Sequence, residues 1–136
     1  MIIIFNKQRK IKINKERILH TATVVMKELH YQDFDLSIVL TNNKTIRSYN
    51  KKYRNKNVPT DILSFPYHQL KAGERIKTLS DDDKNIGDIL ISIEYVQNIL
   101  NLYKVSLEER LDTIIIQNQC CLDIKQKEKS SQSKPG

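Results

Sequence analysis

This sequence has few residues that interrupt regular structure or form covalent links. Its 136 residues include only three glycines and three prolines, and no stretch rich in them divides the chain. A chain of this length without such a break is expected to fold as one domain around one core. The two cysteines, Cys120 and Cys121, are adjacent. Because neighbours in sequence seldom form a disulfide, we expect no disulfide framework and a reducing compartment.

Long hydrophobic runs are also absent. The longest, residues 1–5 and 114–116, are far shorter than the ~20 residues that cross a bilayer. Basic residues follow the first run, which is the wrong order for a secretory signal, and no small-residue cleavage site comes after them. We therefore expect a soluble protein that is not exported and has no membrane partner.

Acidic residues are missing from one region, 43–57, which holds six cations. This short region alone carries +6, whereas the formal charge of the whole chain is +7. A concentrated positive surface on a small domain favours a polyanionic partner, because each neutralised phosphate releases counterions. Solubility alone would also account for a modest positive charge.

The spacing of apolar residues predicts short strands alternating with helices, in the opening order β-α-β. Strands are expected at residues 2–5, 34–40, 62–65 and 89–91, and helices at 15–30, 44–53, after Ser92 and after Ser106. The expected helix N-caps are Asn14, Asn43, Ser92 and Ser106. Residues 67–86 are polar and predict a long surface loop. The Lys/Gln/Ser-rich end predicts disorder from about residue 122.

The predicted helix at 44–53 has two different faces. At 100° per residue, Ile46, Tyr49 and Tyr53 lie within about 60° of one another. The opposite face carries the cations Lys44, Arg47, Lys51 and Arg54. That face is either an ordinary solvated surface or a nucleic-acid contact, and its lack of acids favours the second, since Glu–Lys pairs usually dilute a solvated face. We expect both tyrosines to pack in the core rather than to stack on bases.

Three motifs carry a resemblance to a known family. Residues 50–54 are Asn-Lys-Lys-Tyr-Arg, residues 59–66 are Pro-Thr-Asp-Ile-Leu-Ser-Phe-Pro, and residues 86–89 are Ile-Gly-Asp-Ile. They resemble the Asn-x-x-(Tyr/Phe)-Arg, Pro-Thr-(Asp/Asn)-(Val/Ile)-Leu-Ser-Phe-Pro and Leu-Gly-Asp elements of the YbeY family of metal-dependent ribosomal-RNA endonucleases. A Leu-Lys-Ala-Gly-Glu insertion at 70–74 is similar to animal members. The resemblance extends from the first strand to about Ile115.

The resemblance implies an α/β domain over residues 1–116, with a small mixed sheet of about four strands and flanking helices. Residues 117–136 would form a divergent tail. It also implies an endoribonuclease that acts on single-stranded regions of ribosomal RNA or on a ribosomal subunit, in mitochondria. Residues 1–15 are basic and acid-free, as a transit segment would be, but they also contain the first predicted strand. A cytoplasmic or nuclear location stays open.

Members of that family bind zinc through three histidines in a His-Gly-x-x-His-x-x-Gly-x-x-His pattern. Two histidines at i and i+4 on one helix face, with a third from the next turn, leave a position open for an activating water. In this chain the first of them falls at Gln117, and neither Cys121 nor anything after it restores the pattern. We therefore expect no metal ligands and no bound zinc. The abrupt departure favours an alternative last exon or a frameshift.

Several other residues are candidates for a site. The resemblance gives Arg54 a catalytic role near the substrate phosphate, and a guanidinium suits bidentate phosphate contact. RNA binding is predicted for the whole cationic face: Lys44, Arg47, Lys51 and Arg54. Ser64 is either a motif residue with a function or a strand residue that packs and hydrogen-bonds, whereas structural roles are favoured for Asp61 and Asp88.

The remaining metal-binding residue types are poorly arranged. His20, His30 and His68 are scattered, and no pair of them has ligand spacing. Cys120 and Cys121 point about 100° apart on a helix and make a poor chelate. The acidic residues 81–83 lack the alternation and glycine of a calcium loop.

These features leave three functional hypotheses. The first is the family's endoribonuclease activity, which we expect to be lost in this chain. The second is a non-catalytic isoform that binds RNA or the ribosome through the basic helix 44–54. The third is a poorly folded splice product without activity.

Overall fold

The computed structural model describes residues 1–67, 84–102 and 104–132, with side chains as far as Gln119. Strands and helices follow one another along the chain, and a short 3-10 helix, η2, precedes the last helix. The elements are β1 (Ile2–Asn6), α1 (Lys15–Glu28), β2 (Asp35–Thr41), α2 (Asn43–Arg54), β3 (Ile62–Pro66), β4 (Asn85–Ser92), α3 (Ile93–Ile99), η2 (Leu100–Leu102) and α4 (Leu107–Gln132). The predicted α/β domain with a four-stranded mixed sheet is confirmed.

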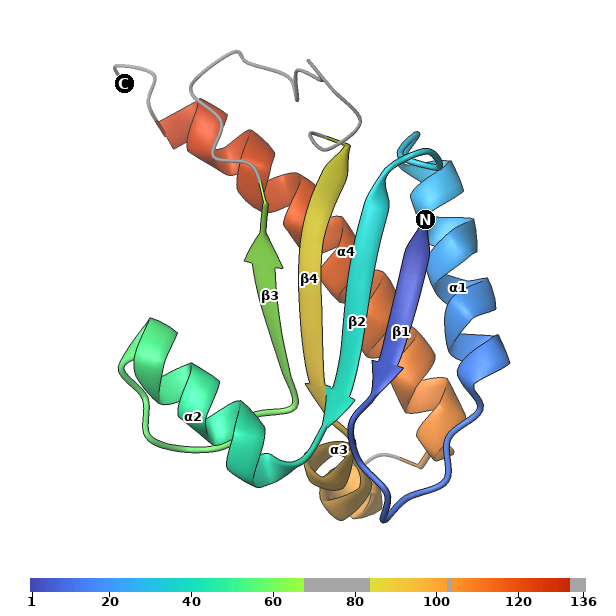
Figure 1. The fold of residues 1–136 in the computed structure, drawn as a ribbon, viewed down its shortest axis with the longest axis vertical. Coiled ribbons are helices and arrows are strands. Elements are labelled where there is room, and N and C mark those ends of the chain that lie inside the picture. The colour runs from blue at the N-terminus through green and yellow to red at the C-terminus, as the bar shows by residue number, and fades with distance from the viewer. Residues whose placement is uncertain (68–83, 103, 133–136) are drawn as a thin grey trace.

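The sheet has the order β1-β2-β4-β3 (Figure 1). β1, β2 and β4 are parallel, and β3 runs antiparallel to β4 at one edge. The parallel strands are connected through helices, as parallel pairs require. β4 pairs on both sides, and its ladder with β2 alone extends from Asn85 to Ser92, eight residues instead of the three that we expected.

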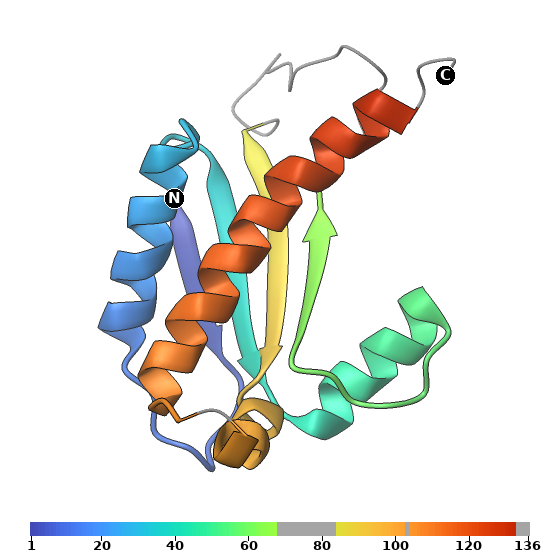
Figure 2. The ribbon, with the colours of Figure 1, turned by 180° about the vertical axis from the view of Figure 1, so that it is seen from behind.

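The main core lies between one face of the sheet and the helices α1 and α4, which cover that face side by side (Figure 2). The strands contribute alternate residues, because successive side chains in a strand point to opposite faces. The buried residues at the centre of this layer are Leu36, Ile38, Leu40, Ile89 and Ile91 from the sheet, Ala22 and Met26 from α1, and Leu111, Ile114 and Ile115 from α4.

An ion pair at the surface also joins the two covering helices. Arg17 of α1 donates from Nη2 and Nε to Asp112 of α4 at 2.8 and 3.0 Å. These hydrogen bonds raise the pKa of the Arg17 guanidinium above its ordinary value. Within the described ranges, no helix is long and apolar enough to cross a membrane.

The opposite face of the sheet is covered less completely. α2 contacts it through Ile46, which is buried against Leu63 of β3 and Leu90 of β4. Towards the β1 edge, the side chains of Ile3 and Phe5 remain exposed. This partly open face lies towards the viewer in Figure 1, with α2 at its lower left.

Three of the four predicted helix caps are confirmed. Asn14 and Ser92 accept hydrogen bonds from the backbone of Arg17 and Tyr95, and Ser106 accepts one from Glu109. The expected N-cap of α2, Asn43, was wrong by one residue. The N-cap is Asn42, whose extended backbone lets its Oδ1 accept from the backbone N–H of Thr45 at 3.0 Å. Asn43 is already helical, and its Oδ1 accepts instead from the Ser92 hydroxyl.

The last helix differs from the expected disorder after about residue 122, since α4 continues to Gln132. Its distal part is rich in Lys, Gln and Glu, which have good helix propensity, and the next proline or glycine is Pro135. The predicted division into a domain at residues 1–116 and a divergent tail at 117–136 stays a prediction. The acidic residues 81–83 and most of the predicted loop lie outside the described residues.

Gly87 permits the close pairing of β3 and β4. It has a φ of +140°, and an added Cβ would overlap the carbonyl oxygen of Phe65 and lie 3.0 Å from Cα of Pro66. A β-bulge between the β2–β4 pairs Asp35–Asn85 and Leu36–Gly87 immediately precedes it.

Replacing Gly87 with Ala is therefore expected to lower the free energy of unfolding by on the order of 2–4 kcal/mol, because positive-φ strain and a backbone clash add. Urea denaturation measures this change. Asp88→Ala, at the exposed neighbouring position, is the control and should stay within about 0.5 kcal/mol of the parent. Equal stabilities of the two variants would contradict the close approach at Gly87.

Candidate nucleic-acid interface

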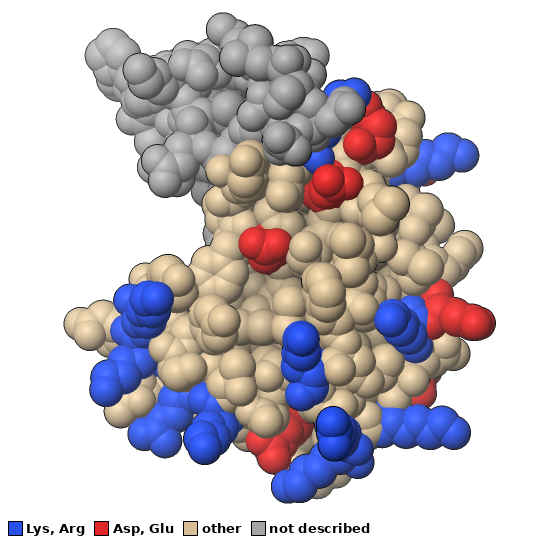
Figure 3. All heavy atoms as spheres, in the orientation of Figure 1, with Lys and Arg blue, Asp and Glu red and all other residues tan. Residues whose placement is uncertain are grey.

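The candidate site is built on α2. The residues Lys44, Arg47, Lys51 and Arg54 are all exposed and follow one another at intervals of three, four and three positions. They therefore form one stripe, here called the cationic stripe, that is about 15 Å long. Figure 3 shows basic side chains gathered over α2 at the lower left, with no acidic side chain among them.

Two of the four stripe residues have a structural explanation. Lys51 and Arg54 lie in the last turn of α2 together with Lys52, where cations stabilise the negative end of the helix dipole. Lys44 lies in the first turn, where a cation is unfavourable. Glu94 of α3 accepts from the backbone N–H of Asn43 at 3.0 Å and pairs with Lys10, so this carboxylate stabilises the helix start without an ion pair to Lys44.

Arg47 and Arg54 differ in how they are held. Nε of Arg47 donates to Oδ1 of Asn57 at 2.9 Å, which fixes the guanidinium against the segment after the helix. Arg54 is the final residue of α2, and Asn55 ends the helix with a φ of +55°. Among the residues that the structure describes, no hydrogen bond or ion pair occupies the Arg54 side chain, so its guanidinium is available to a ligand.

A second cationic group adjoins the start of the stripe. A surface hollow of about 450 Å³ is lined by Lys44 together with Lys7, Arg9 and Lys10 from the segment after β1. Glu94 also lines it and pairs with Lys10 at 3.7 Å. The positive surface thus continues from α2 to the N-terminal segment.

Asn50 is a functional-motif residue whose role the sequence did not reveal. It is only 2% exposed, although it lies between the basic positions of α2. Its Nδ2 donates to the carbonyl oxygen of Val58 at 2.9 Å, and its own carbonyl accepts from Lys56. Asn50 therefore holds the turn that carries the chain from α2 to β3. A buried polar residue in an otherwise exposed polar helix gives no signal in a hydrophobicity pattern.

The expectation that Tyr49 and Tyr53 pack in the core was wrong. Tyr49 is 42% exposed and Tyr53 is 56% exposed. α2 lies beside the edge strand β3, so the sheet covers Ile46 but does not extend far enough to cover the tyrosines. Their rings stack on each other at a centroid distance of 6.1 Å, and both contact Phe65 of β3.

Ser64 links β3 to α4. Its hydroxyl donates to Oδ1 of Asn118 at 2.7 Å, and Nδ2 of Asn118 donates to the carbonyl oxygen of Ile114. This contact favours the packing and hydrogen-bonding role that the sequence left open. The neighbouring Gln117 is exposed.

The two motif aspartates lie in different surroundings. The carbonyl oxygen of Asp61 accepts from the backbone N–H of Ser92, and its side chain accepts from the hydroxyl of Thr60. Asp88 is exposed on the open face, where it is the cross-strand neighbour of Phe65. Asp61 therefore has a structural role, whereas Asp88 adds a carboxylate to the face that bears the aromatic rings.

The described residues do not fit the zinc site that the resemblance implies. No group of three His, Cys, Asp or Glu side chains within them is arranged to hold a metal ion. His20 lies on α1 and His30 just after it, with a positive φ of 64°. The side chains of His68, Cys120 and Cys121 lie outside the described residues. We therefore derive no catalytic step through a metal.

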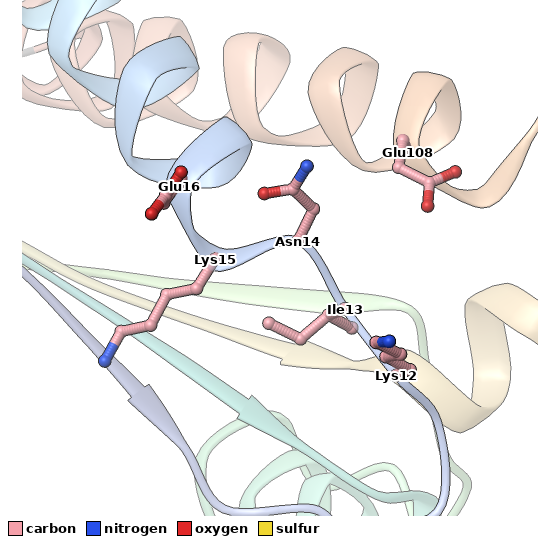
Figure 4. A pocket seen from close by; sticks show the side chains of 6 residues that line it. All are labelled: Lys12, Ile13, Asn14, Lys15, Glu16 and Glu108. Carbon is pink, nitrogen blue, oxygen red and sulfur yellow. The ribbon is translucent and has the colours of Figure 1, made fainter.

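A separate hollow of about 570 Å³ lies at the N-terminus of α1 and is lined by residues 12–16 and Glu108 (Figure 4). It contains no residue of the cationic stripe and combines two lysines with two glutamates, Glu16 and Glu108. Asn14, which lines it, already caps α1. The mixed charge gives this hollow no preference for a polyanion.

The fold and the stripe together define a class: a mixed α/β domain that presents a cationic helix beside the edge of its sheet. A family model described as "Endoribonuclease YbeY" matches residues 3–118. The chain belongs to the YbeY family.

Relatives named "Endoribonuclease YbeY" include a human protein, 44% identical over 96 residues that make up 70% of this chain and 58% of the relative. A protein of Caldicellulosiruptor bescii is 34% identical over 119 residues, 81% of this chain and 73% of the relative. The match thus spans less than two thirds of the human protein. The solution structure of TM1509 from Thermotoga maritima matches with a TM-score of 0.51 at 17% identity, over 88% of this chain and 69% of that one, which shows likeness of fold alone.

The Ser64–Asn118 contact leads to a prediction of stability. Ser64→Ala removes the donor and is expected to lower the free energy of unfolding by about 1 kcal/mol, as urea denaturation would measure. Ser48→Ala is a matched control because Ser48 is exposed and, among the described residues, its hydroxyl bonds only to Thr45 of its own helix. It should change stability by less than about 0.5 kcal/mol. A fully stable Ser64→Ala protein would mean that the contact does not hold β3 to α4.

Proposed function

We propose that this chain has its family's role in ribosomal-RNA maturation and contacts single-stranded ribosomal RNA or a ribosomal subunit through the cationic stripe. The observation that carries the proposal is the set of four exposed cations on one face of α2, none of which pairs with an acid among the described residues. Such a stripe gives sequence-independent affinity for phosphates. The relatives named as endoribonucleases support RNA as the polyanion.

Within this function, Arg54 contacts the phosphate at the position that the family's enzymes cleave. Its guanidinium presents a planar fork of donors that matches two phosphate oxygens. Arg54 is the last residue of α2, before the turn held by Asn50, and its side chain is exposed.

RNA cleavage is a separate part of the family's role. The family's reaction depends on metal, and Gln117 stands where the first ligand is expected. We propose that this chain does not bind zinc and does not cleave RNA by the family's route. An altered C-terminal end, from an alternative last exon or a frameshift, accounts for the difference.

Metal analysis and an RNA cleavage assay test this proposal together. The purified chain is expected to hold only substoichiometric zinc and to leave a single-stranded ribosomal-RNA oligonucleotide intact, with and without chelator, because suitable ligands are lacking. The human relative, assayed in parallel, is the positive control. Stoichiometric zinc together with cleavage that chelator abolishes would overturn the loss of activity.

Non-catalytic RNA binding is what remains of this role without cleavage, and it rests on the same exposed stripe. The triple variant Arg47→Glu, Lys51→Glu and Arg54→Glu should weaken RNA binding by on the order of tenfold or more. It should also reduce the salt slope of the affinity by up to about 2, since each lost phosphate contact on a single strand contributes roughly 0.7. Fluorescence anisotropy at several salt concentrations measures both quantities.

A matched control separates the stripe from net charge. Lys15→Glu, Lys27→Glu and Lys104→Glu change the charge of the chain by the same amount at exposed positions outside α2. This control should retain most of the affinity. Equal losses in both triple variants would mean that total charge, and not the stripe, binds the RNA.

We also propose a mitochondrial location, on the resemblance to animal members of the family and on the basic, acid-free residues 1–15. The cytoplasm and the nucleus are the alternatives, and subcellular fractionation distinguishes the three.

A further inference from the structure

Tyr49 and Tyr53, both exposed on the face of α2 opposite the cationic stripe, form a group with the partly buried Phe65 of β3. Tyr49 and Tyr53 of α2 stack with an interplanar angle of 16°, and Phe65 of β3 meets Tyr53 edge-on at 5.2 Å. We propose that these rings, here called the aromatic platform, stack on unpaired bases of single-stranded RNA. This inference rests on the proposed function and adds to it the part of the nucleotide that is recognised.

The rings are held in place before any ligand binds. Phe65 packs against the small apolar cluster of Ile46, Leu63 and Leu90. The ring centroids of Tyr49 and Phe65 lie 6.4 Å apart, so Phe65 connects the exposed tyrosines to this buried cluster. Aromatic side chains have only two rotatable bonds, and rings fixed by neighbours lose little further freedom on binding.

The charges around the platform favour a nucleic acid over an apolar protein surface. Nζ of Lys52 lies 5.2 Å from the centroid of the Tyr53 ring. A strand whose bases stack on the rings can therefore place a phosphate against this cation. An apolar partner would have to desolvate the ammonium group, which is unfavourable.

Asp88 determines on which side of the rings the phosphate backbone lies. Its exposed carboxylate lies on the sheet face next to Phe65. Phosphates are repelled from this carboxylate and attracted to α2, so the backbone is expected on the α2 side of the rings. The bases then point towards the open sheet face.

That face has room for a base. A hollow of about 380 Å³ adjoins Tyr49 and is lined by Phe5 and Val39 on the sheet and by the hydroxyl-bearing Thr41 and Thr45. Its volume is within the usual range of ~300–1,000 Å³ for small-ligand pockets. Nζ of Lys7 lies 5.7 Å from the Phe5 ring at the same hollow. Apolar walls with a few hydroxyls and an adjacent cation suit a nucleotide.

The test compares two RNA probes with the same backbone: a 12-nucleotide single strand and an abasic strand of equal length. The parent chain is expected to prefer the strand with bases by roughly 5- to 100-fold, since stacking on aromatics has about that effect per base. Tyr49→Leu with Tyr53→Leu should lose this preference while keeping its salt slope, because no phosphate contact is removed. Tyr49→Phe with Tyr53→Phe, which keeps the rings, should retain it.

Tyr31→Leu is the matched control. Tyr31 also belongs to an aromatic pair, since its ring centroid lies 4.9 Å from that of Phe34. This pair lies before the start of β2, whereas α2 follows the end of β2. Cooperative thermal unfolding checks that each variant folds. If the double leucine variant does not fold, Tyr53→Leu alone replaces it, because Tyr53 is the more exposed of the two rings.

The outcomes separate this inference from the proposed function. A parent chain that binds both probes equally, or a double leucine variant that keeps the preference, overturns the platform while the stripe can still bind phosphates. If charge reversal leaves RNA binding unchanged and the double leucine variant loses it, the aromatic platform is supported. The cationic stripe is then overturned as the RNA contact. Sedimentation tests a different occupant of this face. If the double leucine variant keeps its RNA affinity but loses a dimer that the parent forms, the face is a contact between copies of the chain.

Discussion

The pairing of β3 with β4 determines where each residue of the candidate interface lies. The cross-strand pair Leu63–Leu90 forms the surface on which Ile46 rests, and this contact fixes α2 against the sheet. One position further along each strand, the side chains point the other way, and Ser64 reaches α4 instead. A single antiparallel ladder therefore supports α2 on one side and contacts α4 on the other.

The position of α2 explains why polar and aromatic groups meet on its surface. Ile46 and Asn50 are its buried residues, so most of the helix remains available to a ligand. Asn50 fixes the following turn through Val58, and Arg47 is held by Asn57. The helix is thus anchored by one buried apolar side chain, by ring contacts with Phe65 and by several polar contacts. Such an anchor leaves both the cationic stripe and the aromatic platform in contact with solvent, which an ordinary amphipathic helix would not.

Local patterns in the sequence predicted most of the fold but only part of the site. Alternation and helical spacing found the four strands and four helices, because both depend on which residues share a face. The same reasoning misplaced Tyr49 and Tyr53, since a helical projection does not show how far the neighbouring sheet extends. Asn42 and Asn43 are equally good caps in sequence, and tertiary contact with Ser92 distinguishes them. The motif at 59–66 located β3, whereas the buried role of Asn50 required coordinates.

Amide side chains near the end of the described part of α4 attach this helix to two other elements. Gln119 is buried and donates to the carbonyl oxygen of Ala22 in α1 at 2.9 Å. Asn118 contacts Ser64 of β3. These neighbouring residues tie α4 to both of its partners, while the exposed Gln117 contributes no described contact of this kind. Leu111, Ile114, Ile115 and these amides therefore hold α4 on one face of the sheet, whereas α2 packs on the opposite face through Ile46.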